Sequence, residues 1–298
     1  MLHQYIFILG RYKKKLQMFS KAFFTILLIF ILLNTIISAQ VQVVYKEIND
    51  TKLSMDIYYP EKIDSFKVYP AMVFFFGGGW VGGDISQFTN QARYFSKRGL
   101  ICFLVDYRIK SKNNTTPFES VKDAKSAIRF IRKKASYFRV DTTKIIASGG
   151  SAGGQLVAAT ALIDSFFEAT DDLSISCIPN ALILFNPVID NGPGGYGFNL
   201  IGDAYKNFSP LHNIRKGAPP TIIFLGTNDK HIPVETAAYY KKVMEKVGSR
   251  CDLKIYEVQG HGFFNYKNSE YYKKTLMEAD TFLVSLGYLK NEPLIKIE

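Results

Sequence analysis

Histidine and cysteine are scarce in this chain, whose 298 residues include four histidines and three cysteines. The cysteines, Cys102, Cys177 and Cys251, show no C-x-x-C spacing of the kind that metal and redox sites use. So few thiol and imidazole groups argue against a zinc site, and no metal or cofactor is expected. Cys102 lies in an apolar run and is expected to be buried. Cys177 and Cys251 each precede a predicted strand. The sequence does not decide whether they form a disulfide.

A strong charge excess is also missing once the N-terminus is set aside. The formal net charge is +11, but the first 39 residues carry five basic and no acidic residues, which leaves +6 for the rest. This balance is too weakly basic for a nucleic-acid-binding protein. Internal repeats, low-complexity tracts and linkers rich in proline or serine are absent from the sequence as well. We therefore expect one domain, residues 41–290.

Residues 22–37 form a 16-residue run without charge, after a cluster of basic residues and before Ser38-Ala39-Gln40. A positive segment, an apolar core and a small residue ahead of a cleavage point are typical of a secretory signal peptide. The run is short for a membrane span, which needs about 20 apolar residues. We expect residues 1–39 to be a signal peptide and the protein to be secreted or periplasmic. The alternative is an uncleaved anchor through residues 22–37, and no other contact with a membrane is expected.

Strand-like and helical patterns alternate along the rest of the chain. Two alternating segments, 41–48 and 52–59, flank an Asn49-Asp50 turn and predict a hairpin. Continuously apolar segments follow, as in strands that are covered on both faces. Further strands are predicted at 68–76, 99–107, 143–149, 180–186, 220–226 and 252–258. Helices are predicted at 86–98, 118–136, 152–163, 233–247 and 269–287. This order predicts an α/β fold: a mostly parallel eight-stranded sheet, helices on both faces and no large lid domain, with ligands at the carboxyl ends of the strands.

The helix predicted at 118–136 carries basic residues on the side opposite its apolar positions. We interpret this side as a solvated surface, and the alternative is a face that attracts an anionic polymer. The basic residues are Lys122, Lys125, Arg129, Arg132 and Lys133.

Residues 149–153 read Gly-Gly-Ser-Ala-Gly and match G-x-S-x-G, directly after an apolar strand and directly before an Ala/Leu-rich helix. This context predicts a nucleophile elbow, a turn so sharp that the positions two before and two after Ser151 cannot carry side chains. The helix that begins after the turn directs its N-terminal N–H groups at developing negative charge. An ordinary glycine-rich turn is the alternative. We predict that Ser151 is a catalytic nucleophile.

A nucleophilic serine needs a base and an orienting acid, which follow it in the chain order Ser, Asp or Glu, His in this type of site. His261 comes after the last predicted strand between two glycines, and we predict it as the general base rather than an exposed loop histidine. Asp229 follows the preceding strand and is predicted to orient His261 and stabilise its imidazolium form. Asp190, after the strand at 180–186, is the alternative acid.

The glycine-rich segment 77–84, GGGWVGGD, follows the strand predicted at 68–76. Its backbone N–H groups can point to one spot. Gly78 and Gly79, together with Ala152 after the nucleophile, are therefore predicted to form an oxyanion hole. A phosphate-binding loop is the alternative, but the segment lacks the Lys-Ser/Thr ending of a P-loop.

Together these motifs resemble the α/β-hydrolase superfamily, esterase/lipase type with an H-G-G-G-like oxyanion loop. Within that group the chain is similar to bacterial acetyl-esterase and feruloyl-esterase-like carbohydrate esterases. Phe76 stands where the family usually has a histidine before the three glycines, which removes a polar group that braces the loop but leaves the backbone donors. The matching segments follow the family's order: FFFGGGW (74–80), VDYR (105–108), PFESVKDAKSAIRFIR (117–132), GGSAGG (149–154), LFNPVID (184–190), TIIFLGTNDKHIP (221–233) and GHGFF (260–264).

The resemblance implies a serine carboxylic-ester hydrolase that forms an acyl-enzyme and needs no metal. The irregular stretch 187–219 is short and indicates an open cleft, suited to small, acetyl-type acyl groups on a bulky alcohol such as a sugar chain. Aromatic residues near the site are candidates for substrate contacts, with plain packing as the alternative for each. They are Trp80, for stacking on a sugar ring, and Tyr196, Phe198, Phe263 and Phe264, for lining the acyl pocket.

Two other functions stay open. A serine peptidase of the same fold usually carries an additional large domain, and none fits in this chain. A catalytically silent binding module normally lacks the serine or the histidine, and both are present. The expected partner is therefore a small-molecule or polysaccharide ester, and no nucleic acid.

Overall fold

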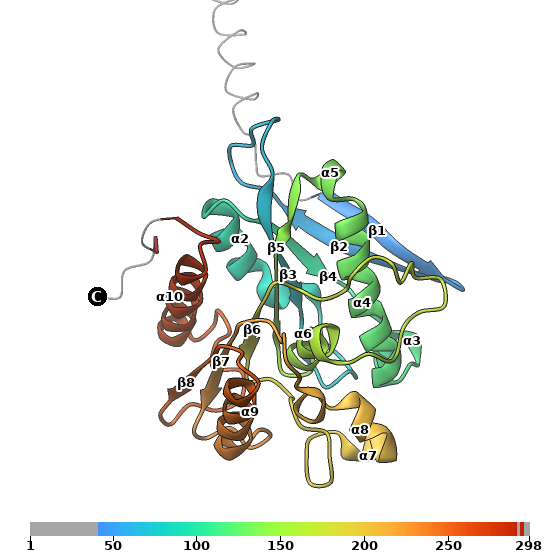
Figure 1. The fold of residues 1–298 in the computed structure, drawn as a ribbon, viewed down its shortest axis with the longest axis vertical. Coiled ribbons are helices and arrows are strands. Elements are labelled where there is room, and N and C mark those ends of the chain that lie inside the picture. The colour runs from blue at the N-terminus through green and yellow to red at the C-terminus, as the bar shows by residue number, and fades with distance from the viewer. Residues whose placement is uncertain (1–40, 291–292, 295–298) are drawn as a thin grey trace, which may run out of the picture. The chain divides into compact units, whose positions relative to one another are not determined.

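An eight-stranded sheet organises the residues that the computed structural model describes, 41–290 and 293–294, all within one compact unit (Figure 1). The strand order is β1-β2-β4-β3-β5-β6-β7-β8. β2 is antiparallel to both of its neighbours, and every other pair is parallel. The strands are β1 (Val41–Ile48), β2 (Thr51–Tyr58), β3 (Tyr69–Phe75), β4 (Ile101–Val105), β5 (Val140–Gly150), β6 (Ala181–Phe185), β7 (Thr221–Gly226) and β8 (Cys251–Tyr256).

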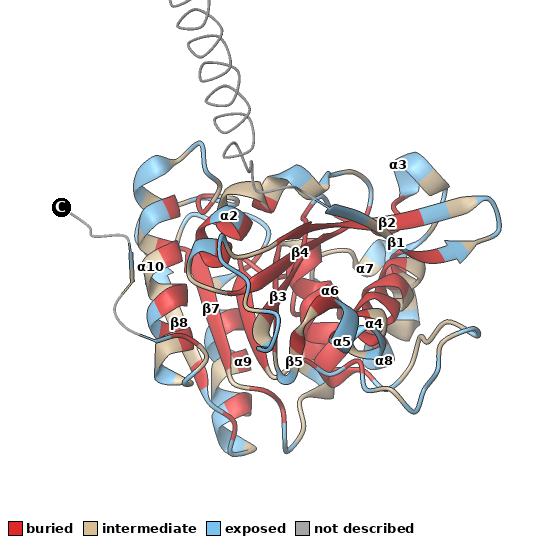
Figure 2. Ribbon diagram, turned by 90° about the horizontal axis from the view of Figure 1, so that it is seen from above, coloured by how far each residue is buried: buried red, intermediate tan, exposed pale blue. Residues whose placement is uncertain are grey.

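Helices cover both faces of the sheet, so its central strands are buried along their length (Figure 2). On one face α4, α6 and α9 contribute core residues such as Ile128, Leu156 and Tyr240. On the other face α2 and α10 contribute residues such as Phe95 and Leu276. The α-helices are α2 (Thr89–Lys97), α3 (Lys110–Asn113), α4 (Pro117–Lys133), α5 (Ala135–Phe138), α6 (Ala152–Leu162), α7 (Phe198–Ile201), α8 (Tyr205–Phe208), α9 (Val234–Lys246) and α10 (Ser269–Ser285). Short 3-10 helices lie at Ile85–Phe88, Gly202–Ala204 and Pro210–Asn213.

The predicted fold class is confirmed, and each predicted strand and helix has a counterpart within a few residues. The helix predicted at 118–136 consists of two pieces, α4 and the short α5. α4 begins where Thr116 and Glu119 form a capping box, which satisfies N–H groups that a helix start leaves unpaired. It ends at Lys133, because the next residue, Lys134, has a φ of −101° and a ψ of 18° and leaves the helical region.

The basic side of α4 is a solvated surface only in part, and that prediction is wrong for two of its residues. Lys125 has no exposed area, and Arg129 is 7 % exposed. Lys125 donates to the carbonyl oxygens of Ile163 and Ser165, while Arg129 pairs with Asp171 at 2.9 Å. The chain that follows α6 therefore folds back over this side of α4. Helical periodicity cannot reveal such a long-range contact.

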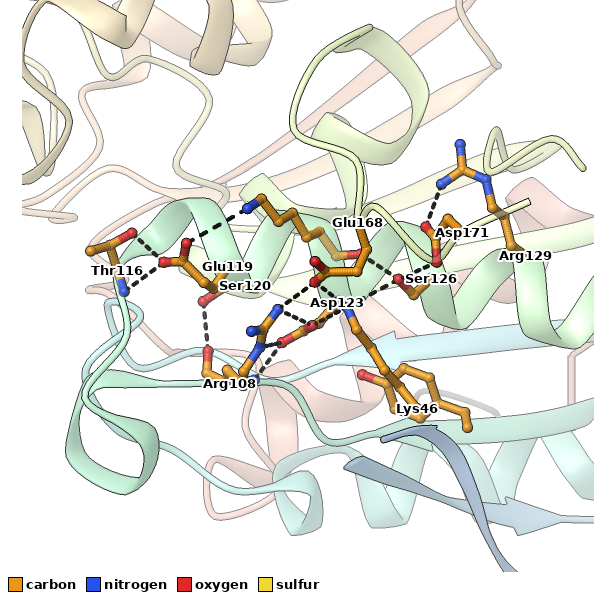
Figure 3. A network of polar contacts seen from close by, with 12 residues as sticks. Lys46, Arg108, Thr116, Glu119, Ser120, Asp123, Ser126, Arg129, Glu168 and Asp171 are labelled. Atoms are coloured by element: carbon orange, nitrogen blue, oxygen red, sulfur yellow. Dashed lines mark hydrogen bonds and ion pairs between the residues drawn. The ribbon is translucent and has the colours of Figure 1, made fainter. Parts of the chain in front are cut away.

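Beside these residues lies a buried charge network, formed by Lys46, Arg108, Asp123 and Glu168 (Figure 3). Asp123 accepts hydrogen bonds from Lys46 Nζ at 2.6 Å and from Nε and Nη2 of Arg108, both at 2.8 Å. Glu168 accepts from the same two cations at 2.8 and 2.9 Å. Two carboxylates thus balance two cations, the condition under which proteins tolerate buried charges. The network joins β1, α4 and the segments after β4 and α6.

The predicted signal peptide, residues 1–39, lies outside the described residues, and so does its apolar run. In the part of the chain that the structure describes, no helix combines the length and apolar character that crossing a bilayer requires. Cys102, Cys177 and Cys251 are buried free thiols. Cys177 and Cys251 therefore form no disulfide.

Candidate active site

Ser151 stands at the turn between β5 and α6, where the chain passes from strand to helix within one residue. Its φ of 54° and ψ of −119° lie outside the regions that residues with a side chain favour. The N–H of Ser151 donates to the carbonyl of Phe185 at 2.9 Å, and its own carbonyl accepts from the N–H groups of Gln155 and Val188, both at 3.1 Å. These bonds to neighbouring elements hold the strained residue at the carboxyl edge of the sheet.

The glycines around Ser151 are required by close backbone contacts. A Cβ on Gly149 would lie 2.5 Å from the backbone of Gly153. A Cβ on Gly153 would lie 2.1 Å from the carbonyl oxygen of Phe75, at the end of β3. Both distances are far below van der Waals contact. The turn therefore has no room for side chains two positions before and after the serine, as the G-x-S-x-G spacing predicts.

Two loops at the same edge of the sheet bring an imidazole and a carboxylate to the serine. His261 lies in the loop after β8, and its Nε2 is 2.9 Å from Ser151 Oγ. Asp229 lies in the loop after β7, and its Oδ2 accepts from His261 Nδ1 at 2.7 Å. The three side chains form one hydrogen-bonded series. A hydroxyl in such a series can pass its proton to the ring while its oxygen attacks an electrophile.

The carboxylate of Asp229 is buried yet held in its ionised form. Its Oδ1 accepts from the backbone N–H groups of His231 at 2.8 Å and Ile232 at 3.1 Å. Burial opposes ionisation, but the hydrogen bond from His261 and these two backbone bonds outweigh it and keep the pKa of Asp229 below its usual value. A negative charge beside Nδ1 fixes the proton on that nitrogen and stabilises the protonated ring.

Free backbone donors lie beside the serine. Gly78 and Gly79 follow β3 with φ angles of 134° and 63°, which favour glycine. No group within the described residues accepts a hydrogen bond from their N–H groups. Ala152 opens α6, where helix N–H groups have no partner inside the helix. The two segments are close, because a Cβ on Gly77 would lie 3.3 Å from the Cβ of Ser151.

The glycine-rich turn is braced by the side chains of Tyr107 and Gln87. The ring of Phe76 stacks on Tyr107 with centroids 4.2 Å apart, and the Tyr107 hydroxyl donates to the carbonyl of Phe76 at 2.6 Å. Gln87 accepts from the N–H of Gly77 at 2.7 Å and donates to the side chain of Asn265 at 3.0 Å. Since Asn265 belongs to the loop after β8, Gln87 joins both loops of the site.

Known proteins share this arrangement of sheet and loops. Residues 55–190 match the BD-FAE family, and residues 186–286 match the dienelactone hydrolase family. Esterase 2 of Thermogutta terrifontis, in its structure phosphorylated by paraoxon, superposes with a TM-score of 0.80 and 42% sequence identity. The match covers 85% of this chain and 96% of that chain. The chain belongs to the α/β-hydrolase esterases. The family predicted from the sequence is thereby confirmed.

This esterase is also similar to longer curated proteins. The acetylxylan esterase of Xylanibacter ruminicola is 26% identical over 72% of this chain and 46% of its own length. The isoprenylcysteine alpha-carbonyl methylesterase of Arabidopsis thaliana is 26% identical over 70% of this chain and 53% of its own length. The chain thus spans about half the length of the curated relatives it matches.

Asn186 is a residue of the site that the sequence motifs do not single out. It follows β6 directly, and its Nδ2 lies 3.1 Å from Nε2 and 3.4 Å from Nδ1 of His261. The side chain is 1 % exposed, so it packs against the ring and limits its movement. One signal in the sequence could have identified Asn186: it is a polar residue directly after a buried strand, at the edge of the sheet where ligands bind.

Three aromatic residues predicted to contact substrate are core residues instead, and those predictions are wrong. Trp80 is 1 % exposed and packs between Tyr196 and Phe208, so its ring is too buried to stack on a sugar. Phe263 and Phe264 are 5 % and 1 % exposed, and Phe264 stacks on Phe185 with centroids 4.6 Å apart. Large aromatic side chains gain most by burying their area, and the sheet offers space for them beneath the loops.

Tyr196 and Phe198, the other two aromatic candidates, are half-buried. The Tyr196 hydroxyl approaches the glycine-rich turn, 2.8 Å from the position that a Cβ on Gly79 would take. Phe198 packs against Tyr205, with centroids 5.9 Å apart. Tyr196 therefore lies at the site, whereas the described contacts of Phe198 are with its own segment.

Asp190, the alternative acid, is not hydrogen-bonded to His261. Its Oδ1 accepts from the N–H of Gly192 at 2.8 Å and lies 3.8 Å from Nδ1 of His212. Of the two candidate acids, only Asp229 contacts the imidazole.

Proposed function

We propose that this esterase hydrolyses small, acetyl-type esters of a carbohydrate through an acyl-enzyme on Ser151. One observation carries the proposal. Ser151 Oγ lies 2.9 Å from His261 Nε2, and Asp229 accepts from the other ring nitrogen at 2.7 Å. This geometry supports nucleophilic catalysis by the serine, with the histidine as general base and the aspartate as its orienting partner.

In the first step, Ser151 Oγ attacks the ester carbonyl while His261 Nε2 takes the hydroxyl proton. The imidazolium then gives this proton to the oxygen of the leaving alcohol as the ester C–O bond breaks, and the acyl group stays on Ser151. In the second step, a water molecule gives a proton to His261 Nε2 as its oxygen attacks the carbonyl of the acyl-enzyme. The bond between the acyl carbon and Ser151 Oγ then breaks, the imidazolium returns the proton to Oγ, and the carboxylic acid leaves. Asp229 stays ionised and stabilises the imidazolium in both steps.

The backbone N–H groups of Gly78, Gly79 and Ala152 form the oxyanion hole in this proposal. Their position beside Ser151 and the lack of other acceptors for Gly78 and Gly79 among the described residues support the assignment. In such sites one donor is typically worth about 3 kcal/mol of the activation barrier. Tyr107 and Gln87 act as positioning residues, because they tie the turn that presents these donors.

Features of the relatives and of the fold support the substrate class. Thermogutta terrifontis esterase 2 has been solved with propionate bound and with butyrate bound, and one curated relative is an acetylxylan esterase. Between β6 and β7 the chain forms only helices of three or four residues. A segment this small favours an open cleft, which a bulky sugar alcohol needs.

A substrate series tests the proposal. Rates on p-nitrophenyl acetate, butyrate and octanoate are compared, and acetate release from acetylated xylan is measured alongside. We expect kcat/KM to fall with acyl length, and acetate to be released from xylan. A preference for octanoate, or an inert xylan, contradicts the substrate class, whereas turnover that survives Ser151→Ala contradicts the mechanism.

We also propose that the protein is exported to the periplasm or the medium, with residues 1–39 as its signal peptide. The basic residues ahead of the uncharged run 22–37 support this. Expression of the full chain in a bacterial host, followed by N-terminal sequencing of the exported protein, tests it. The expected mature chain begins at Gln40, and an uncut chain in the membrane fraction would show that the run is an anchor.

A further inference from the structure

A cavity of about 350 Å³ opens between the segment after β6 and the start of α9. Polar side chains from both segments line it, and none of them takes part in the hydrogen-bonded series at Ser151. They are Asp190, Tyr196, Lys230, His231 and Thr236.

The cavity shares a wall with the candidate active site. The ring of His231 packs edge to face on His261, with centroids 4.9 Å apart and an interplanar angle of 87°. On its other side His231 packs on Tyr196 at 5.4 Å. Tyr196 in turn approaches Gly79 of the glycine-rich turn. The cavity therefore borders the candidate active site, since His231 and Tyr196 line it and also contact the imidazole and the glycine-rich turn.

The position next to the imidazole identifies the part of the substrate that reaches the cavity. In the proposed mechanism His261 protonates the oxygen of the leaving alcohol, so the alcohol part of the ester extends from the side of this ring. We propose that the cavity is the subsite for this alcohol and that its occupant is polyhydroxylated, such as a single sugar ring. This inference rests on the proposed esterase function and deepens it.

The charges of the lining support a neutral polyol. Asp190 is oriented by the N–H of Gly192 at 2.8 Å, and its carboxylate can accept hydrogen bonds from hydroxyl groups. Lys230 is exposed and forms no ion pair within the described residues, so its ammonium group is available as a donor. Asp190 would repel an anion, and Lys230 would repel a cation. Neutral hydroxyl groups can form hydrogen bonds with both residues. A volume of about 350 Å³ is near the lower end for small-molecule sites and suits one small unit.

Two esters with the same acyl group test the inference: an acetylated methyl xyloside and ethyl acetate. Lys230→Met and Asp190→Asn each remove one charge at similar side-chain size, and the asparagine keeps an acceptor for Gly192. Lys242→Met, on the exposed side of α9, is the matched control. We expect the ratio of kcat/KM for the sugar acetate to that for ethyl acetate to fall about tenfold in each cavity variant, since hydrogen bonds to charged groups are worth this much. The control keeps the wild-type ratio.

An unchanged ratio in both cavity variants overturns the inference and leaves the proposed function standing, because ethyl acetate is still hydrolysed. An equal loss on both esters also overturns it, since the residues then act on the catalytic groups and not on the alcohol. A changed preference between ethyl acetate and ethyl butyrate assigns the cavity to the acyl group instead, which likewise overturns it. A wild-type protein that hydrolyses none of these esters defeats the proposed function, and the inference with it.

Discussion

The site around Ser151 and the charge network around Asp123 are both clusters of hydrogen-bonded polar groups, but they differ in how completely their atoms are paired. Asp123 has no exposed area and accepts from two cations and a backbone N–H. At the site, Ser151 has a φ of 54°, the His261 side chain is 25 % exposed, and the N–H of Gly78 has no acceptor in the described part of the chain.

The two clusters serve different ends. A buried charge network offsets the cost of desolvation only when every charge is paired. Removing one member of a closed network is therefore strongly destabilising, and its paired groups offer nothing to a ligand. A catalytic site keeps free donors and a strained backbone for a transition state, at some cost in stability. Substitutions at the site should therefore change rates and spare stability, while substitutions in the network should do the reverse.

The largest expected effect is at the nucleophile. Ser151→Ala should lower kcat for p-nitrophenyl acetate on the order of 10⁶-fold, as removal of a nucleophilic serine does in other hydrolases. The melting temperature should stay near the wild-type value, because the side chain is small and the turn keeps its backbone bonds. Steady-state kinetics and thermal unfolding measure the two effects. A variant that loses its fold along with its activity would remove the contrast between the two clusters.

The next effect is at the orienting acid. Asp229→Asn should lower kcat about 10⁴-fold, because a neutral amide neither fixes the Nδ1 proton nor stabilises the imidazolium. The exposed Asp203→Asn, in the segment after β6, is the control for loss of a carboxylate. Equal kcat values for the two variants would mean that Asp229 is a structural residue.

In the network the expected effect is on stability. Asp123→Asn should lower the free energy of unfolding by about 3–5 kcal/mol, because Lys46 and Arg108 stay buried with one carboxylate between them. Urea unfolding measures the loss, and kcat/KM of the folded variant should stay close to the wild-type value. The double variant Lys46→Met/Asp123→Asn should recover part of the loss, since it also removes a cation. A single variant as stable as the wild type would refute this role of the network.

The smallest effect is the pH dependence at Glu168. Burial opposes ionisation of this carboxyl, but Lys46 and Arg108 outweigh it and lower its pKa below 4.5. The unfolded chain therefore binds the proton more readily, and the stabilisation is complete above pH 4.5 and lost as the pH falls through the lowered pKa. Urea unfolding of wild type and Glu168→Gln should differ most at neutral pH, with the difference shrinking in acid. A difference in unfolding free energy that grows as the pH falls would contradict a lowered pKa for Glu168.

The strands and the series Ser151, Asp229 and His261 are predictable because their signals are local. Continuous apolar runs mark buried strands, and the elbow needs glycines at fixed spacings from the serine. Once the nucleophile is identified, the chain order of the fold restricts the acid and the base to residues that follow particular strands.

The errors arise where distant segments meet. Lys125 and Arg129 occupy the polar side of an amphipathic helix, and nothing local shows that the chain after α6 covers them. Trp80 and Phe264 follow motifs of the site in sequence, yet their rings turn into the core. Asn186, after β6, contacts the ring of His261, which lies in the loop after β8. Burial and contact at these positions depend on tertiary packing, which periodicity does not encode.

The most direct test of the central claim is to find the side chain that paraoxon modifies, since this reagent phosphorylates the Thermogutta relative. Peptide mass spectrometry should find one phosphoryl group per chain, on Ser151, with activity lost in proportion to labelling. His261→Ala should react far more slowly, because the hydroxyl then lacks its base. Inactivation with the label on another residue, or labelling of Ser151 at an undiminished rate in His261→Ala, would contradict the proposed mechanism.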